Sequence, residues 1–245
     1  MKIIDILNSK KTISFEFFPP KQESDLPKLH ETVDRLSTYN PDFVSFTYGA
    51  GGNTRQLTTQ VSKEAKLSDK FEVMSHLTCI AHNEKEIVDI LKDLRLSNIE
   101  NIIALRGDTP KDMNISNNNL KHGTDLIEII KSNFSNFCIA GACYPESHPE
   151  SNNFEDEIFF TKMKQDKGAD FLITQLFYNN KDFLSFREKA LKNGVTIPII
   201  PGILPITSTK QIRRFTKMCG ATIPTQLNEK LENSINDDIE TTKLG

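Results

Sequence analysis

Glu16 is the first residue of the 245-residue chain whose type and neighbours suggest chemistry. It lies in the run Ser14-Phe15-Glu16-Phe17-Phe18, with aromatic residues on both sides. We predict that poor solvation raises the pKa of its carboxyl group, which would suit it to donate a proton near neutral pH. The alternative is a structural glutamate that pairs with a buried Arg or Lys.

Polar residues also follow or interrupt several later apolar runs. His76 lies near the end of one run, Arg106-Gly107-Asp108 follows another, and Gln175 interrupts a third. A cation and a carboxylate around a glycine turn can bind a ligand or pair with each other. A lone histidine on a strand is more often a core residue than a catalyst. A buried glutamine needs hydrogen-bond partners, which a ligand with an amide-like edge would supply.

Two loop-like segments have compositions that suit ligand contact. Residues 48–55 are rich in glycine but lack the third glycine of the dinucleotide-binding GxGxxG pattern, so they predict either close backbone approach to a ligand or a tight turn. Residues 144–150 form a polar loop stiffened by prolines. The sequence contains no HExxH, no His/Cys cluster and no P-loop, so we expect no metal site and no nucleotide-triphosphate chemistry.

The elements that must position these residues follow from the hydrophobic pattern. Strand-like apolar runs alternate with amphipathic helix-like segments about every 30 residues, which predicts a parallel sheet with right-handed crossovers. Most runs are apolar on both faces, as strands buried between two layers are. Asn83 is the predicted N-cap of one helix. The seven strand-like runs are residues 12–18, 43–48, 72–78, 99–105, 137–143, 171–177 and 197–200.

The length fits one (β/α)8 barrel, and no linker divides the chain, so we expect a single domain over residues 1–245. Seven strands are one short of a closed barrel, and the chain turns polar over residues 228–243. Two alternatives stay open: an open sheet, or a TIM barrel that lacks its eighth strand and last helix. Residues 114–119 are polar enough to predict a flexible loop.

Composition excludes several classes of function. The net charge of −3 and the pI near 6.0 come with no basic face, so nucleic-acid binding is not expected. No apolar run approaches the ~18 residues of a membrane span, and the N-terminus does not fit a signal peptide. The four cysteines form no CxxC pair and are expected to be reduced, mostly buried thiols. We therefore expect a cytoplasmic protein with no membrane partner.

Taken in order, the motifs resemble bacterial methylenetetrahydrofolate reductase. The matching runs are FEFFPPK, TYGAGG-TR, HLTC, ALRGD, YPE-HPE, TQLF and PGILPI, and the resemblance extends from about residue 13 to residue 245. It implies a TIM-barrel enzyme that binds FAD without a Rossmann unit. Relatives are homo-oligomers, and the oligomeric state of this chain stays open. NADH or NADPH would reduce the flavin, and 5,10-methylenetetrahydrofolate would then receive the hydride and become 5-methyltetrahydrofolate for methionine synthesis. Relatives continue into an eighth strand and a last helix, which this chain is expected to lack.

The resemblance also implies residue roles. Glu16 matches the general acid that helps the folate ring open to an electrophilic iminium, and the charge of Asp108 would favour that cation. Gln175 matches a substrate-binding residue, and Phe215 matches an aromatic that packs against folate or nicotinamide. The positions implied to contact FAD are Thr47, His76, Arg106, Gly107, Asp108, Tyr144, His148 and Lys164.

Some positions depart from the family pattern. His122-Gly123 stand where relatives often have Tyr-Ala, so a flavin contact there stays open, and Phe160 and Met163 replace polar residues. One alternative function is a catalytically silent member that binds only flavin or folate, although the retained charged residues argue against it. Another is a different TIM-barrel flavoprotein, such as a proline dehydrogenase relative, against which FEFFPPK and TQLF argue. The choice between NADH and NADPH stays open, because the sequence carries no readable ribose-phosphate motif.

Overall fold

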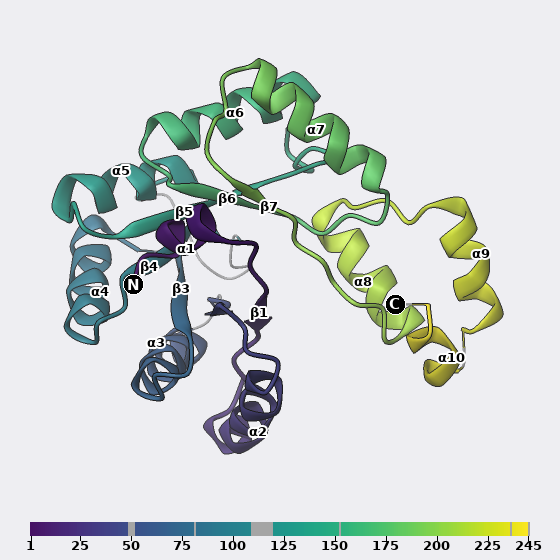
Figure 1. Ribbon diagram of the computed structural model, residues 1–245, viewed down its shortest axis with the longest axis horizontal. Coiled ribbons are helices and arrows are strands. Elements are labelled where there is room, and N and C mark those ends of the chain that lie inside the picture. Colours follow the sequence, from purple (N-terminus) through teal and green to yellow (C-terminus); the bar gives the residue numbers. More distant parts are fainter. Residues whose placement is uncertain (49–51, 81, 109–119, 152, 236, 245) are drawn as a thin grey trace. The chain divides into compact units, whose positions relative to one another are not determined.

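A computed structural model gives the fold (Figure 1). It describes residues 1–48, 52–80, 82–108, 120–151, 153–235 and 237–244, with the backbone alone for 52–55. The predicted loop at 114–119 and the glycine-rich residues 49–51 lie outside the described residues. The chain forms two compact units. The N-terminal unit comprises Met1–Gly141 and Asp166–Phe171, and the C-terminal unit comprises Ala142–Gln165 and Leu172–Gly245.

The N-terminal unit alternates strands and helices. Its strands pair in parallel with their neighbours, in registers such as Glu16 opposite Ser45 and His76 opposite Ile103. The carboxyl ends of parallel strands lie at one edge of a sheet, so residues at those ends come close together. The elements are α1 (Ile3–Ser9), β1 (Ser14–Phe17), η1 (Glu23–Asp25), α2 (Leu26–Ser37), β2 (Phe43–Phe46), α3 (Gly52–Leu67), β3 (Glu72–Thr78), α4 (Glu84–Leu96), β4 (Asn101–Leu105), α5 (Gly123–Asn133) and the first part of β5 (Cys138–Cys143).

A hydrophobic core joins β1, β2 and β3 to α2 and α3. Phe17 stacks on Phe46 with 5.6 Å between ring centroids, and both rings are buried. Burying each such side chain contributes roughly 1.5–3 kcal/mol. Helix α4 starts with the predicted cap: Asn83 Oδ1 accepts from the Glu86 N–H, and the Glu86 carboxylate accepts from the Asn83 N–H. The N-cap prediction for Asn83 is confirmed.

The C-terminal unit begins within β5. It contains α6 (Phe154–Asp166), β6 (Phe171–Thr174), α7 (Asn180–Lys192), β7 (Ile199–Ile200), α8 (Thr209–Cys219), α9 (Thr225–Asn233) and α10 (Asp238–Thr242). Strands β6 and β7 pair in parallel. Phe186 of α7 is fully buried in one core, and Ile212 of α8 and Leu231 of α9 lie in a second. Buried hydroxyl groups link α8 to α10, since Thr209 Oγ1 lies 3.3 Å from Thr241 Oγ1.

The predicted fold class is confirmed. The strands follow the order β1 to β7 with helices between them, as in a TIM barrel, and the described residues contain seven of its eight strands. The predicted strands are correct in number but mostly too long by one to three residues at their ends. Three of the cysteines are buried and all four are free thiols. No helix within the described residues is long and apolar enough to span a membrane.

Candidate active site

Glu16 and His76 form a close pair at the carboxyl ends of β1 and β3. Glu16 Oε2 lies 3.3 Å from His76 Nε2. The Glu16 side chain keeps 45% of its surface exposed, whereas that of His76 keeps 7%. Their geometry favours charge attraction over a hydrogen bond, and His76 Nε2 is buried without a hydrogen-bond partner among the described residues. The exposed member of the pair is the Glu16 carboxylate, which a ligand at the strand ends can reach.

The prediction of a raised pKa for Glu16 is wrong for the free protein. Partial burial does act to raise the pKa of the carboxyl group, but the charge of His76 and the nearby Ser45 hydroxyl outweigh it and hold the pKa below its ordinary value. The aromatic neighbours in sequence did not predict this, because alternate residues of a strand point to opposite faces. Neither is Glu16 paired with a buried Arg or Lys, as the structural alternative required; its partner is the histidine.

The turn after β4 depends on a glycine. Gly107 has φ +85°, and a Cβ placed there would lie 2.8 Å from side-chain atoms of Thr78 and Ile80. Any other residue would therefore be both strained and crowded. Arg106 Nε donates to the Gly107 carbonyl at 3.3 Å, and the Arg106 carbonyl accepts from Ile80 N–H at 2.9 Å. Asp108, two residues further, is exposed.

Thr47 is fixed by its main chain just beyond β2. Its N–H donates to the Phe17 carbonyl at 2.9 Å, and its carbonyl accepts from Thr58 Oγ1 at 2.8 Å. The next residue, Tyr48, places its hydroxyl 3.1 Å from Nε2 of the buried His82. His82 was not predicted as a site residue, because a lone histidine with no spacing pattern carries no sequence signal.

In the C-terminal unit, a buried glutamate organises the loop that follows β5. Glu157 of α6 is 2% exposed, and its carboxylate accepts from the His148 N–H at 3.3 Å and from Ser151 Oγ at 3.4 Å. Burial raises the pKa of Glu157, and the Lys164 charge with the N–H groups of His148 and Tyr144 offsets only part of that effect. The sequence prediction missed Glu157, although it lies seven residues before Lys164, at helical spacing on one face of α6.

The rings that this loop presents lie against each other. Tyr144 and His148 are in edge-to-face contact with 4.7 Å between centroids, and His148 Nδ1 accepts from the Glu150 N–H at 3.1 Å. Tyr144, His148 and Lys164 were all predicted to contact a cofactor, and the structure places all three around Glu157. The C-terminal unit therefore brings this subset of the predicted residues together.

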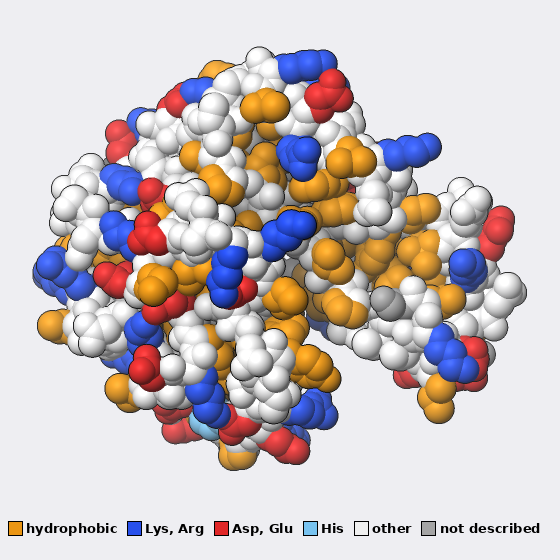
Figure 2. Space-filling view, viewed as in Figure 1, with side chains coloured by type: hydrophobic (Ala, Val, Ile, Leu, Met, Phe, Trp, Pro, Cys, Tyr) orange, Lys and Arg blue, Asp and Glu red, His pale blue; other side chains and the backbone are white. Residues whose placement is uncertain are grey.

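Gln175 and Phe215 belong to the same unit but to different elements. Gln175 follows β6, where its N–H donates to the Cys143 carbonyl and its own Oε1 accepts from the Leu176 N–H, both at 2.8 Å. The residue is half-buried, so the prediction of a buried amide holds only in part. Phe215 is half-buried on α8, and Figure 2 shows hydrophobic side chains gathered where Figure 1 draws that helix. Both residues are thus accessible to a ligand of this unit.

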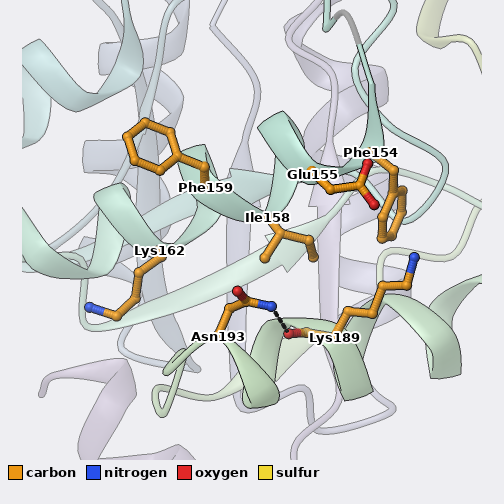
Figure 3. Close-up of a pocket in the computed structure, with 7 residues that line it drawn as sticks. All are labelled: Phe154, Glu155, Ile158, Phe159, Lys162, Lys189 and Asn193. Atoms are coloured by element: carbon orange, nitrogen blue, oxygen red, sulfur yellow. Dashed lines mark hydrogen bonds between the residues drawn. The ribbon is translucent and has the colours of Figure 1, made fainter.

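A groove of about 220 Å³ lies between α6 and α7 (Figure 3). Lys189 Nζ lies 4.3 Å from the Phe154 ring centroid at one end of it, and Asn193 Nδ2 donates to the Lys189 carbonyl at 2.8 Å. None of the predicted site residues lines this groove. Its chemistry is that of a helix–helix surface rather than of a reaction centre.

Comparison with known proteins decides the family. The model of the family described as methylenetetrahydrofolate reductase matches residues 2–245. The chain belongs to the methylenetetrahydrofolate reductase family. It is 38% identical over 243 residues to the 5,10-methylenetetrahydrofolate reductase of Buchnera aphidicola from Schizaphis graminum, covering 99% of this chain and 82% of the relative. It is 37% identical over 232 residues to that of Escherichia coli K12, covering 95% and 77%. The chain is therefore an oxidoreductase of this family.

Solved structures support the fold. An uncharacterised Clostridium thermocellum protein that binds two copies of 5-methyl-5,6,7,8-tetrahydrofolic acid aligns with a TM-score of 0.66 at 23% identity, over 98% of this chain and 82% of that one. A phosphonopyruvate hydrolase aligns with a TM-score of 0.56 at 10% identity, over 94% and 82%. At these identities the likeness concerns the fold alone.

The departures from the methylenetetrahydrofolate reductase pattern have local explanations. Helix α5 starts at Gly123, where a Cβ would lie 3.2 Å from the Ala104 carbonyl oxygen, so a small residue suits the position. The Asp125 carboxylate accepts from the His122 N–H at 2.9 Å, which fixes the helix start through the main chain. Phe160 is 42% exposed on α6, as a ligand-facing or surface residue would be.

Proposed function

We propose that the chain reduces 5,10-methylenetetrahydrofolate to 5-methyltetrahydrofolate, using NADH or NADPH and a bound FAD. The observation that carries the proposal is the Glu16–His76 pair at the carboxyl ends of β1 and β3, in the unit that also holds Asp108. The bacterial relatives are named for this reaction, which supports the choice of substrate. We extend the proposal to one catalytic domain over residues 1–245 of a cytoplasmic enzyme that serves methionine synthesis.

The residues present fit a flavin dinucleotide. Gly107 offers bare main chain at the end of β4, the His76 ring lies beside Glu16 at the strand ends, and Arg106 supplies a fixed cation. When bound, FAD would supply a two-electron carrier between the nicotinamide and the folate. The residues that would hold it are Thr47, His76, Arg106, Gly107 and Asp108 in the N-terminal unit and Tyr144, His148 and Lys164 in the C-terminal unit.

Because the pKa of Glu16 is lowered in the free protein, Glu16 can act as an acid only if ligand binding raises it. In the free protein the group favours its ionised form, since His76 outweighs burial. A folate ring that covered the exposed 45% of the side chain would exclude water, which raises a carboxyl pKa. A Glu16 carboxyl that took up a proton in this way would then donate it to the folate nitrogen. The negative charge of Asp108 would favour the cationic iminium that ring opening produces.

Gln175 and Phe215 would hold the substrate. The Gln175 side chain is half-buried, and its Oε1 accepts a hydrogen bond from the Leu176 N–H. Its amide hydrogens would donate to a polar edge of the ligand. Phe215 offers an aromatic face on α8 against which a flat ring can pack. The same face would serve the pteridine or the nicotinamide, because each carries a planar ring.

The test is product formation by the purified chain. The protein would be mixed anaerobically with FAD, NADH and 5,10-methylenetetrahydrofolate, and 5-methyltetrahydrofolate would be quantified by mass spectrometry. We expect one molecule of product for each NADH oxidised, and no flavin reduction when proline replaces NADH and folate. Oxidation of proline would favour the proline dehydrogenase alternative. Tight binding of FAD or folate without any product would favour the catalytically silent alternative.

A further inference from the structure

The loop after β5, residues 144–150, is joined to the segment that follows α8 through Glu146. Both carboxylate oxygens of Glu146 accept from the Thr222 N–H, at 3.0 Å and 3.2 Å. Thr222 lies just beyond the end of α8, whose C-cap is Gly220. A Cβ on Gly220 would lie 2.8 Å from Pro149 Cγ, so the two segments also touch directly. The loop and the end of α8 are therefore in contact at two points within the C-terminal unit.

Buried Glu157 of α6 also binds this loop, and the loop contains a strained residue between its contacts with Glu157 and with α8. Ser147 has φ +76°, a left-handed conformation that a non-glycine side chain disfavours. The Ser147 N–H donates to the Tyr144 carbonyl at 3.1 Å, which closes a tight turn. His148, one residue further, donates its N–H to Glu157. A strained residue persists only where its surroundings fix it, and here the fixing contacts come from α6 on one side and from the end of α8 on the other.

We propose that Glu146 is a positioning residue that ties the flavin-binding loop to the helix that carries Phe215. This inference rests on the proposed function, because it takes Tyr144 and His148 as flavin contacts and Phe215 as the substrate aromatic. Glu146 lies between the two loop residues in sequence, and Thr222 lies seven residues after Phe215. The tie makes the loop and the helix adopt one arrangement, so FAD affinity and substrate affinity are set by the same contact.

Substitutions at Glu146 can distinguish the loss of this one contact from a general loss of folding. The donor is a main-chain N–H, so the contact needs an acceptor at position 146 and nothing from the Thr222 side chain. Glutamine keeps one acceptor oxygen in the same place, whereas alanine removes it. Glu229 is an exposed glutamate on α9 of the same unit and serves as a matched control.

The first readout uses the chain without added cofactor. Hydrogen exchange would be followed at the amides of Thr222, Tyr144 and His148 in the wild type and in Glu146→Ala, Glu146→Gln and Glu229→Ala. We expect Glu146→Ala to speed exchange at all three amides by about tenfold, the scale of one lost charge-assisted hydrogen bond. Glu146→Gln should recover most of the protection, and Glu229→Ala should match the wild type. Faster exchange at Thr222 alone would overturn the proposal, because the loop would then be independent of the helix.

The second readout uses the holoenzyme. For Glu146→Ala we expect the FAD Kd and the KM for folate to rise together by about five- to tenfold, with kcat within about twofold, since the contact positions groups without touching the reacting atoms. Glu146→Gln should restore both values. An alanine variant with wild-type Kd and KM would overturn this inference and leave the proposed function intact. A wild-type chain that binds no FAD and forms no 5-methyltetrahydrofolate would overturn the proposed function, and the flavin role of this loop with it.

Discussion

Two glutamates, one in each compact unit, respond to their surroundings in opposite directions. Glu16 on β1 keeps 45% of its side chain exposed, and His76 lowers the pKa of its carboxyl. Glu157 on α6 is 2% exposed, and burial raises the pKa of its carboxyl despite several donors and Lys164. Desolvation acts on both groups; at Glu16 the combined effects of His76 and Ser45 outweigh it, whereas at Glu157 the Lys164 charge and the hydrogen bonds do not.

The contrast also suggests two different roles for the two carboxylates. A half-exposed, ionised carboxylate next to a buried histidine can take up and release a proton when a ligand covers it. A fully buried carboxylate that accepts main-chain N–H groups holds a loop in place. We therefore assign chemistry to Glu16 and loop geometry to Glu157, and each assignment makes a different prediction.

The largest expected effect tests the chemical assignment. Glu16→Gln removes the ionisable group and should slow flavin reoxidation by 5,10-methylenetetrahydrofolate by at least about 100-fold, the usual scale of general acid catalysis. Flavin reduction by NADH should stay within about threefold of wild type, because that step needs no proton from Glu16. Stopped-flow absorbance measures both half-reactions. The matched control is Glu23→Gln, an exposed glutamate of η1 in the same unit. An unchanged folate rate would refute the acid role.

The next effect tests the geometric assignment. Glu157→Ala leaves the His148 N–H and the Ser151 hydroxyl without their acceptor in a buried place and should lower the free energy of unfolding by about 3 kcal/mol. Glu157→Gln, which keeps an acceptor, should cost less than about 1 kcal/mol. Urea unfolding followed by circular dichroism measures both. Glu155→Ala, an exposed change on the same helix, should have little effect, and a similar loss there would contradict the assignment.

A smaller effect tests the turn that presents Arg106 and Asp108. Gly107→Ala combines a left-handed φ with a 2.8 Å clash and should cost about 2 kcal/mol of stability. Gly194 also has a positive φ, but a Cβ there would meet only the flexible end of Lys162 at 3.2 Å. Gly194→Ala should therefore cost about 1 kcal/mol. Equal losses in the two variants, measured by urea unfolding, would show that crowding at Gly107 is unimportant.

The smallest effect concerns the pH dependence of stability. Glu157 has a raised folded-state pKa, so its contribution is fully present below the ordinary value of 4.5 and is lost as pH rises through the raised value. Glu16 has a lowered pKa, so its contribution is present above 4.5 and is lost as pH falls through the lowered value. Glu157→Gln should remove a slope of at most about 1.4 kcal/mol per pH unit above 4.5. Glu16→Gln should flatten the curve only below 4.5. Unfolding curves between pH 3.5 and about 7 compare the variants, and slopes of the same sign would contradict the comparison.

The sequence predicted the order of elements better than their limits. The run at 72–78 was predicted with the bounds of β3, and six of its seven residues are buried. The run at 171–177 was predicted too long, since β6 ends at Thr174 and the Gln175 side chain then bonds its own neighbour. Helices α9 and α10 were not predicted in the polar segment. Each buries little, with Leu231 and Thr241 as the buried residues named for them, so their pattern is weak.

The site was predicted as a set of positions but not as an electrostatic arrangement. Strand ends indicated Glu16, His76 and Asp108, since parallel strands carry such residues to one edge. The sequence could not indicate that His76 lies 3.3 Å from Glu16 and reverses its pKa shift, because that contact joins residues 60 positions apart. Glu157 was missed because a charged residue in a helix is most often on the solvent face.

The central claim is that this chain is a flavin-dependent folate reductase, and an anaerobic absorption spectrum of the purified chain tests it most directly. We predict the spectrum of oxidised flavin after incubation with FAD, its bleaching on addition of NADH, and its return on addition of 5,10-methylenetetrahydrofolate. A protein that stays colourless after incubation with FAD, or a flavin spectrum that folate fails to restore, would contradict the account.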